Sequence, residues 1–267
     1  MRLSLPSARG ARVAPVPPRP YVGEELVCIP TDAGQLWIPA SDGVMRPYLE
    51  EQGNWEPEEG ALLGQFFRPG LRFLDVGANV GYFSLLVAAS CPGATIHAFE
   101  PHPLTSRVLG LNAWSANADI HVHAMALSAG DRVLSLATAE SNLGDTRSSA
   151  SGRGTMLAPA APLDEVIPGA VFDLVKIDVQ GFEQETVSGM LGMLRRSPGV
   201  VVVAEFWPAA LRDRGLEPVA VLEGYRQLGL TVRAQVGREL TTPTAVETVR
   251  ICDEAGPNGQ VNLVLTT

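Results

Sequence analysis

Acidic side chains stand at the ends of short apolar segments, where they could bind a ligand together. Asp75 lies in the segment Arg72-Phe-Leu-Asp-Val76 and precedes the turn Gly77-Ala-Asn-Val-Gly81, and Glu100 ends the next apolar segment, 19 residues after Gly81. Glycine lets a backbone approach a ligand, and an acid at the end of a second strand can accept hydrogen bonds from both hydroxyls of a ribose. The order and spacing favour a nucleoside site over a plain tight turn followed by a helix-capping acid.

The turn also indicates which nucleoside would fit. A dinucleotide-binding turn reads GxGxxG, because a pyrophosphate must rest on the N-terminus of the following helix. Here the spacing is GxNxG, and Asp75 comes two residues before the first glycine. That carboxylate would repel a pyrophosphate and attract the ammonium or sulfonium group of S-adenosylmethionine (SAM). The alternative function is that of a nicotinamide-dependent oxidoreductase, and the missing third glycine of the GxGxxG pattern argues against it.

A second group of charged residues follows later in the chain. Lys176 and Asp178 lie in Val175-Lys-Ile-Asp-Val-Gln-Gly181, and alternation along a strand puts both on one face. Lys176 is the only lysine of the chain, which favours a need for a compact ammonium over a planar guanidinium. The two residues form either a structural ion pair or a site in which Asp178 faces the transferred group.

Glu205 ends the next apolar segment, Val200-Val-Val-Val-Ala-Glu205. Carboxylates at neighbouring strand ends could hold a divalent cation, or one of them could act as a base. Glu205 could also simply cap the following turn. The sequence alone assigns no metal ligand and leaves these alternatives open.

Alternating strands and helices position these residues. We expect strands over 72–76, 94–100, 119–126, 172–178, 200–205, 230–236 and 261–266, with helices over 57–67, 82–89, 103–116, 182–196 and 217–228. This alternation predicts an α/β fold, a doubly wound, mostly parallel Rossmann-like sheet with one core. Residues 138–162, rich in small and polar residues without a clear period, are expected to form a long loop beside the site.

The N-terminal part divides in two. Residues 1–20 hold four arginines and five prolines without an acid, so we expect a disordered or loosely attached tail, with a transit peptide as the alternative. Residues 21–56 contain two apolar pieces around the turn-like Pro30-Thr-Asp-Ala-Gly34, which predicts a β-hairpin extension. Residues 57–267 would then form the main domain.

Composition narrows the class of partner. The chain has 267 residues, a formal charge of -9 and 46% apolar residues, which is typical of an ordinary globular protein. The acidic balance argues against nucleic acid and against an anionic membrane surface as partners. Three sparse cysteines predict reduced thiols and a cytoplasmic location. We expect a small-molecule substrate, and a homodimer stays open.

The motifs as an ordered set resemble a known family. The blocks DVGANVGYFS, AFEPHP, LDEVIP, DLVKIDVQGFE and VVAEFWP are similar to those of the FkbM family of class I SAM-dependent methyltransferases, over roughly residues 55–236. The resemblance implies methyl transfer from SAM, mostly to hydroxyls of natural products or sugars. Gln180 departs from it, since the family more often has glutamate there, and Glu56 would approach the methionine end of SAM.

Together these considerations define a predicted site. The predicted catalytic residues are Asp178, Lys176 and Glu205. The predicted cofactor-binding residues are Glu56, Asp75, Gly77, Ala78, Asn79, Gly81, Tyr82, Phe83, Glu100, Pro101 and Ala126. We expect SAM-dependent O-methylation of a small natural product or sugar, with a divalent cation open, and the alternatives are the oxidoreductase named above and a SAM-binding module without turnover.

Overall fold

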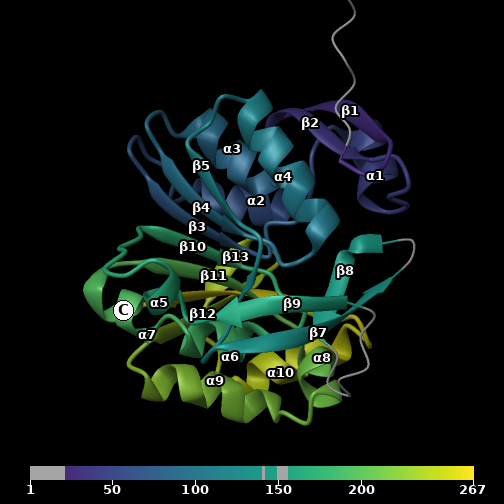
Figure 1. Ribbon diagram of the computed structural model, residues 1–267. Coiled ribbons are helices and arrows are strands. Elements are labelled where there is room, and N and C mark those ends of the chain that lie inside the picture. Colours follow the sequence, from purple (N-terminus) through teal and green to yellow (C-terminus); the bar gives the residue numbers. More distant parts are fainter. Residues whose placement is uncertain (1–21, 140–141, 149–155) are drawn as a thin grey trace, which may run out of the picture.

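The computed structural model describes residues 22–139, 142–148 and 156–267. Its main sheet has eight strands in the order β13-β12-β14-β11-β10-β3-β4-β5, and helices cover both of its faces (Figure 1). The strands of this sheet are β3 (Arg72–Val76), β4 (Thr95–Phe99), β5 (Ile120–His123), β10 (Leu174–Ile177), β11 (Val201–Phe206), β12 (Thr231–Val236), β13 (Glu239–Thr241) and β14 (Val261–Thr266).

The strand directions make the sheet mostly parallel. Strands β5, β4, β3, β10 and β11 pair in parallel, whereas β14 runs antiparallel between β11 and β12. The doubly wound, mostly parallel sheet expected from the sequence is confirmed. In such a sheet the carboxyl ends of the parallel strands lie along one edge, where ligands bind.

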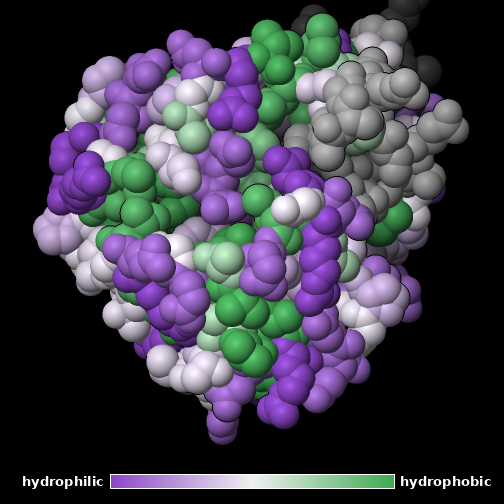
Figure 2. All heavy atoms as spheres, turned by 90° about the horizontal axis from the view of Figure 1, so that it is seen from below, coloured by the Kyte–Doolittle hydropathy of each residue, from purple (hydrophilic) through white to green (hydrophobic). Residues whose placement is uncertain are grey.

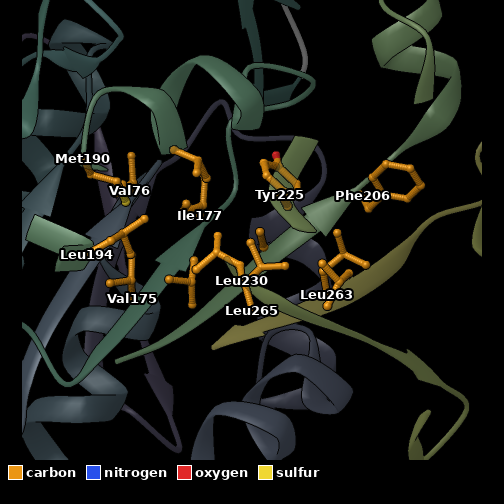
Figure 3. Close-up of a cluster of buried hydrophobic side chains, with 14 of the residues drawn as sticks. Val76, Val175, Ile177, Met190, Leu194, Phe206, Tyr225, Leu230, Leu263 and Leu265 are labelled. Carbon is orange, nitrogen blue, oxygen red and sulfur yellow. The ribbon is translucent and has the colours of Figure 1, made fainter. Parts of the chain in front are cut away.

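Helices α2 (Pro57–Gly64), α3 (Tyr82–Ser90) and α4 (Pro103–Ser115) lie on one face of the sheet. The other face carries α5 (Leu163–Val166), α6 (Glu183–Ser188), α7 (Leu191–Arg196), α8 (Pro208–Asp213), α9 (Pro218–Gln227) and α10 (Ala245–Glu254). Successive strand residues alternate between the two hydrophobic clusters, as Leu74 and Val175 of one cluster and Phe73 and Leu174 of the other show. Figure 3 shows the first cluster, in which side chains of β3, β10, β11 and β14 meet those of α7 and α9.

The N-terminal extension packs on the α3–α4 side. Strands β1 (Leu26–Thr31) and β2 (Gly34–Pro39) form the expected antiparallel hairpin, and helix α1 (Met45–Gln52), which the sequence did not indicate, follows it. The buried Asn112 of α4 fastens the hairpin, since its Oδ1 accepts the Trp37 N–H at 2.8 Å and its Nδ2 donates to the Trp37 carbonyl at 2.9 Å. The expected tail, residues 1–20, lies outside the described residues.

The loop expected over 138–162 is wrong, because much of this segment is strand. Strands β6 (Ala126–Leu127), β7 (Arg132–Ala139), β8 (Asn142–Ser148) and β9 (Met156–Ala161) form a second sheet in the order β6-β9-β7-β8. Its inner face buries Leu136, Ala158 and Ala160, whereas Val133 and Leu157 are exposed. The buried side chains are mostly small, so the alternation of hydrophobicity that normally reveals a strand is weak here.

Two other elements are shorter than predicted. The strand expected over 119–126 divides into β5 and β6, and the helix expected over 182–196 divides into α6 and α7 around Gly189. A side chain at Gly189 would overlap the Ser128 carbonyl at the start of the second sheet. The missing side chain at Gly189 therefore lets the break between α6 and α7 lie close to the second sheet.

No helix in the described residues is long and apolar enough to cross a bilayer. On the face shown in Figure 2, hydrophobic residues form separate patches among hydrophilic ones.

Candidate active site

The turn between β3 and α3 is held against neighbouring backbone. Gly77 has a φ of 82°, and a side chain there would overlap the Asp178 carbonyl. Gly81 has a φ of 92°, and a side chain there would overlap Leu109 of α4. Only glycine adopts such angles without strain. The two glycines therefore serve close packing within the protein, which places the Gly77 turn directly beside the end of β10.

Glu100, at the end of β4, is anchored by this turn. Its Oε2 accepts the Asn79 N–H at 2.8 Å, and its Oε1 accepts the His102 N–H at 2.8 Å. Burial raises the pKa of Glu100 to about 6, although these backbone hydrogen bonds oppose the shift. Each carboxylate oxygen has further acceptor capacity, so Glu100 can accept hydrogen bonds from a bound diol.

A first cavity opens over Glu100. Its lining comes from the ends of β3, β4 and β10 together with the second sheet, namely Val76, Gly77, Asn79, Phe99, Glu100, Pro101, Ala126, Leu127, Leu134, Leu136, Asp178, Val179, Gln180 and Phe182. The volume is about 80 Å³, below the ~300–1,000 Å³ of typical ligand pockets. A nucleoside would enter only if part of the wall moved, and Leu134 and Leu136 of β7 belong to that wall.

One residue that lines this cavity, Asn79, has a polar atom without a partner among the described residues. The Asn79 side chain donates to the Met45 sulfur at 3.9 Å, but its buried Oδ1 accepts no hydrogen bond from the described residues. Asn79 also has a positive φ of 51°, which asparagine tolerates better than most residues. A buried acceptor left open is costly unless a ligand or water satisfies it.

Asp75 lies beside this cavity rather than in it. Its side chain is fully buried, its Oδ2 accepts the Ser84 hydroxyl at 2.6 Å, and its Oδ1 has no partner among the described residues. Burial raises the pKa of Asp75, while Lys176 opposes the shift. The structure therefore places Asp75 in the layer between β3 and α3, where a charge is expensive.

Lys176 lies at the centre of a buried charge cluster. Its Nζ is 3.1 Å from Asp178 Oδ2, 3.7 Å from Glu59 Oε2 and 4.7 Å from the centre of the Phe83 ring. Burial opposes the charged form, but the surrounding carboxylates outweigh it and raise the Lys176 pKa well above its ordinary value. The side chain is buried and lines neither cavity described here, so its role is to hold its carboxylate partners.

Gln180 links the two carboxylates that the sequence singled out. Its Nε2 donates to Asp178 Oδ1 at 3.0 Å and to Glu205 Oε2 at 3.2 Å. Burial first, and then the charge of Asp178, raises the pKa of Glu205 well above its ordinary value. Asp178 thus has both oxygens engaged, one by an ammonium and one by an amide.

A second, larger cavity lies on the other side of Asp178. Its volume is about 540 Å³, within the usual range for ligand pockets. Its lining residues are Glu56, Pro57, Glu58, Glu59, Asp178, Glu205, Gln235, Val236, Gly237, Ile251, Ala255, Gln260, Val261 and Asn262. None of these described residues is basic, so the cavity disfavours anions. Asp178 lines both cavities.

The predicted cofactor residues separate into three groups. Those that line the first cavity are Gly77, Asn79, Glu100, Pro101 and Ala126, and Glu56 lines the second. Those away from both cavities are Asp75, Ala78, Gly81, Tyr82 and Phe83. Tyr82 instead donates its hydroxyl to Asp32 Oδ1 at 2.6 Å in the N-terminal extension, and Ala78 packs against Leu109.

The sequence prediction missed residues that bring the site together. Glu59 was hidden because acids are common in the first turn of a helix, where they satisfy its dipole. Its pKa is raised well above the ordinary value by burial, against the effect of Lys176, and it shares a hydrogen bond with Glu56. Gln180 was noticed only as a departure from the family pattern. Within the described ranges, no group of three or more His, Cys, Asp or Glu residues has the geometry of a metal site.

Comparison with known proteins adds a family and several similar folds. The FkbM methyltransferase domain matches residues 75–213. Over 50 residues the chain is 48% identical to the 31-O-demethyl-FK506 methyltransferase FkbM of Streptomyces tacrolimicus, a match that covers 19% of each protein. The aligned stretch thus spans about a fifth of that relative's length.

Similar solved structures cover most of the described chain. The precorrin-6y C5,15-methyltransferase of Geobacter metallireducens is 13% identical with a TM-score of 0.45, covering 81% of this chain and 91% of that one. A TehB-like SAM-dependent methyltransferase of Corynebacterium glutamicum is 14% identical with a TM-score of 0.48, covering 83% and 94%.

Proposed function

The chain belongs to the FkbM methyltransferase domain family, and we propose that it is a SAM-dependent enzyme that methylates a hydroxyl group of a small molecule. The observation that carries this proposal is the position of Asp178. This carboxylate lines both the cavity over Glu100 and the larger acidic cavity. A group so placed can act where a cofactor and an acceptor meet. Asp178 is therefore our candidate for the base that removes the hydroxyl proton.

The residues of the first cavity suit SAM. Glu100 can accept hydrogen bonds from the ribose hydroxyls, and the open Asn79 Oδ1 can accept one from an ammonium or amino group. The N–H groups of Gly77 and Ala78 are not free to bind an anion, because they donate to the Phe99 carbonyl at 2.9 and 3.0 Å, and the Asn79 N–H donates to Glu100 at 2.8 Å. A pyrophosphate would therefore find fewer free donors in this turn, which weakens the nicotinamide alternative.

In the proposed mechanism the protein supplies alignment and a proton acceptor. SAM, when bound, supplies an electrophilic methyl group on a positively charged sulfur. The methyl–sulfur bond would break as the acceptor oxygen bonds to the methyl carbon, so that S-adenosylhomocysteine would be the leaving group. The acceptor hydroxyl, entering from the larger cavity, would donate its proton to Asp178. Lys176 and Gln180 hold the two Asp178 oxygens in place, which fixes the direction of the free lone pairs.

The larger cavity indicates the class of acceptor. Carboxylates and the amides of Gln235, Gln260 and Asn262 line it, so an uncharged polyhydroxylated molecule, or one bearing an amine, would fit better than a phosphorylated or carboxylated one. The relative from Streptomyces is named for an O-demethyl acceptor, which supports a natural product or sugar hydroxyl here. The free cysteines Cys28, Cys91 and Cys252 support the cytoplasmic location we propose.

Calorimetric titration with SAM and, separately, with NAD tests the cofactor. We expect SAM and not NAD to bind, and binding of NAD alone would overturn the proposal. Release of S-adenosylhomocysteine with a panel of neutral, cationic and anionic alcohols tests turnover. Tight SAM binding without release of S-adenosylhomocysteine for any acceptor class would instead identify a SAM-binding module without turnover.

A further inference from the structure

We propose that Gln180 is a positioning residue whose amide occupies the place of a bridging cation between Asp178 and Glu205, so that the site works without a divalent metal ion. The proposal rests on the methyltransferase function proposed above. It concerns a point on which the sequence left two readings open, a cation held by the two carboxylates or a base without one.

The position of the amide nitrogen is the first argument. Gln180 Nε2 lies 3.0 Å from Asp178 Oδ1 and 3.2 Å from Glu205 Oε2. Both partners are acceptors, so the group between them must be the NH₂ side of the amide. A Mg²⁺ ion shared by these oxygens would lie about 2.0–2.1 Å from each, in the space that this nitrogen now fills. The amide and a bridging cation therefore exclude each other.

The backbone at Gln180 is the second argument. Its φ is 52°, one of four positive values among the described residues other than glycine, and two of the other three belong to Glu56 and Asn79 at the same site. The next residue, Gly181, has a φ of 92° and lies against Ala210 of α8. The packing of Gly181 against Ala210 thus holds the backbone of the turn after β10, from which the Gln180 side chain reaches both carboxylates.

Charge is the third argument. Lys176 is the only buried ammonium that the described residues place near Asp178, Glu59 and Glu56, and burial together with the charge of Asp178 raises the pKa of Glu205. A neutral donor keeps two carboxylates close together and adds no charge to this acidic cluster. A third carboxylate at this position would add one more negative charge, which only a proton or a metal ion could offset.

The substitution Gln180→Glu tests the inference, with Gln184→Glu as a matched control. The control makes the same chemical change four residues later in α6, at a side chain that lines neither cavity. We would titrate each purified protein with Mn²⁺ alone by calorimetry and record melting temperatures in chelator and in saturating Mn²⁺. Wild type and Gln184→Glu should show no saturable site. Gln180→Glu should bind Mn²⁺ at least tenfold more tightly and melt higher with the ion than in chelator.

Two results would overturn the inference. One is equal Mn²⁺ binding by Gln180→Glu and Gln184→Glu. The other is a wild-type protein that binds Mn²⁺ at this site, or whose turnover is abolished by chelator and restored by Mg²⁺. The Mn²⁺ titration needs neither SAM nor an acceptor, so a wild-type protein that fails to bind SAM would refute the proposed function while leaving the test of Gln180 decisive.

If Gln180→Glu folds neither in chelator nor in saturating Mn²⁺, the substitution Gln180→Met provides a second test of the inference. Methionine matches glutamine in length but donates no hydrogen bond, so Asp178 and Glu205 would face each other without a bridge. Glu56, Glu59 and Glu183 also face Glu205, and Lys176 faces Asp178, but these groups are common to both proteins. Relative to wild type, Gln180→Met should lose more melting temperature at pH 8 than at pH 5. An equal loss at the two pH values would show that the amide does not bridge the carboxylates.

Discussion

Replacing Asp178 by asparagine separates a catalytic role from a purely structural one. The substitution keeps the shape of the side chain but removes its charge and its ability to accept a proton. If Asp178 takes the hydroxyl proton, turnover should fall by roughly 100- to 10,000-fold, the usual contribution of a positioned base. SAM affinity should change little, because Glu100 and Asn79, which we propose as cofactor contacts, keep their places.

The structure also sets the expected loss of stability. Removing one partner of a buried ion pair commonly costs about 3–5 kcal/mol. Here Lys176 keeps Glu59 at 3.7 Å, and the asparagine oxygen can still accept a hydrogen bond from the ammonium. We therefore expect a smaller cost of about 1–3 kcal/mol in the free energy of unfolding. For a chain of this size that corresponds to a decrease of roughly 2–12 °C in melting temperature.

The measurements are turnover and melting temperature on the same preparation, with Asp173→Asn as the control. Asp173 directly precedes β10, at the end of the strand that lies away from the cavities. Its Oδ1 binds Arg72 Nη2 at 2.6 Å and Arg68 Nη2 at 2.8 Å. The control should lose melting temperature and keep its turnover per folded molecule. An Asp178→Asn protein that behaves like the control would refute the assignment of Asp178 as the base.

Three further changes test neighbouring parts of the site. Glu100→Ala should weaken SAM binding by about 1–3 kcal/mol, measured by calorimetry, and unchanged affinity in a folded variant would remove Glu100 from the ribose site. Because the Glu100 pKa is about 6, wild-type SAM affinity should fall up to about tenfold between pH 7 and pH 5, and the Ala variant should lack this dependence. Lys176→Met should raise the folded-state pKa values of Glu59 and Asp75 further above their unfolded values. Stability is then lost as pH rises, so the variant should lose more melting temperature at pH 8 than at pH 5, and the opposite order would contradict the charge assignment.

The parallel sheet was predictable because its strands are continuous apolar segments that end in polar turns. Strands β3, β10 and β11 are buried on both faces, so they can be recognised as continuous apolar segments without a periodic pattern. The second sheet was not predicted because its buried face is made largely of alanine. Helices α1 and α8 were not predicted because they are short, and α8 begins at a proline soon after a strand.

The sequence predicted at which strand ends the site residues lie, but it did not predict how deeply each side chain is buried. The sequence places Asp75 and Glu100 alike at the ends of neighbouring strands, yet the structure buries Asp75 against Ser84 and opens Glu100 to the cavity. The difference follows from the side of the sheet each side chain takes and from what the next helix packs against it. Contacts across the sequence, such as Gly77 with Asp178, are set by tertiary packing and leave no local pattern.

The alternatives that the sequence set against each other for Asp178 are compatible in the structure. One carboxylate oxygen pairs with Lys176 and the other accepts from Gln180, while the same side chain borders both cavities. An ion pair and a base need not compete, because an ammonium behind the carboxylate holds its orientation and leaves lone pairs directed into the cavity. The single lysine also fits this place better than an arginine would, since its compact ammonium lies between Glu59, Asp178 and the Phe83 ring. The structural role of Lys176 and the chemical role proposed for Asp178 are therefore parts of one arrangement.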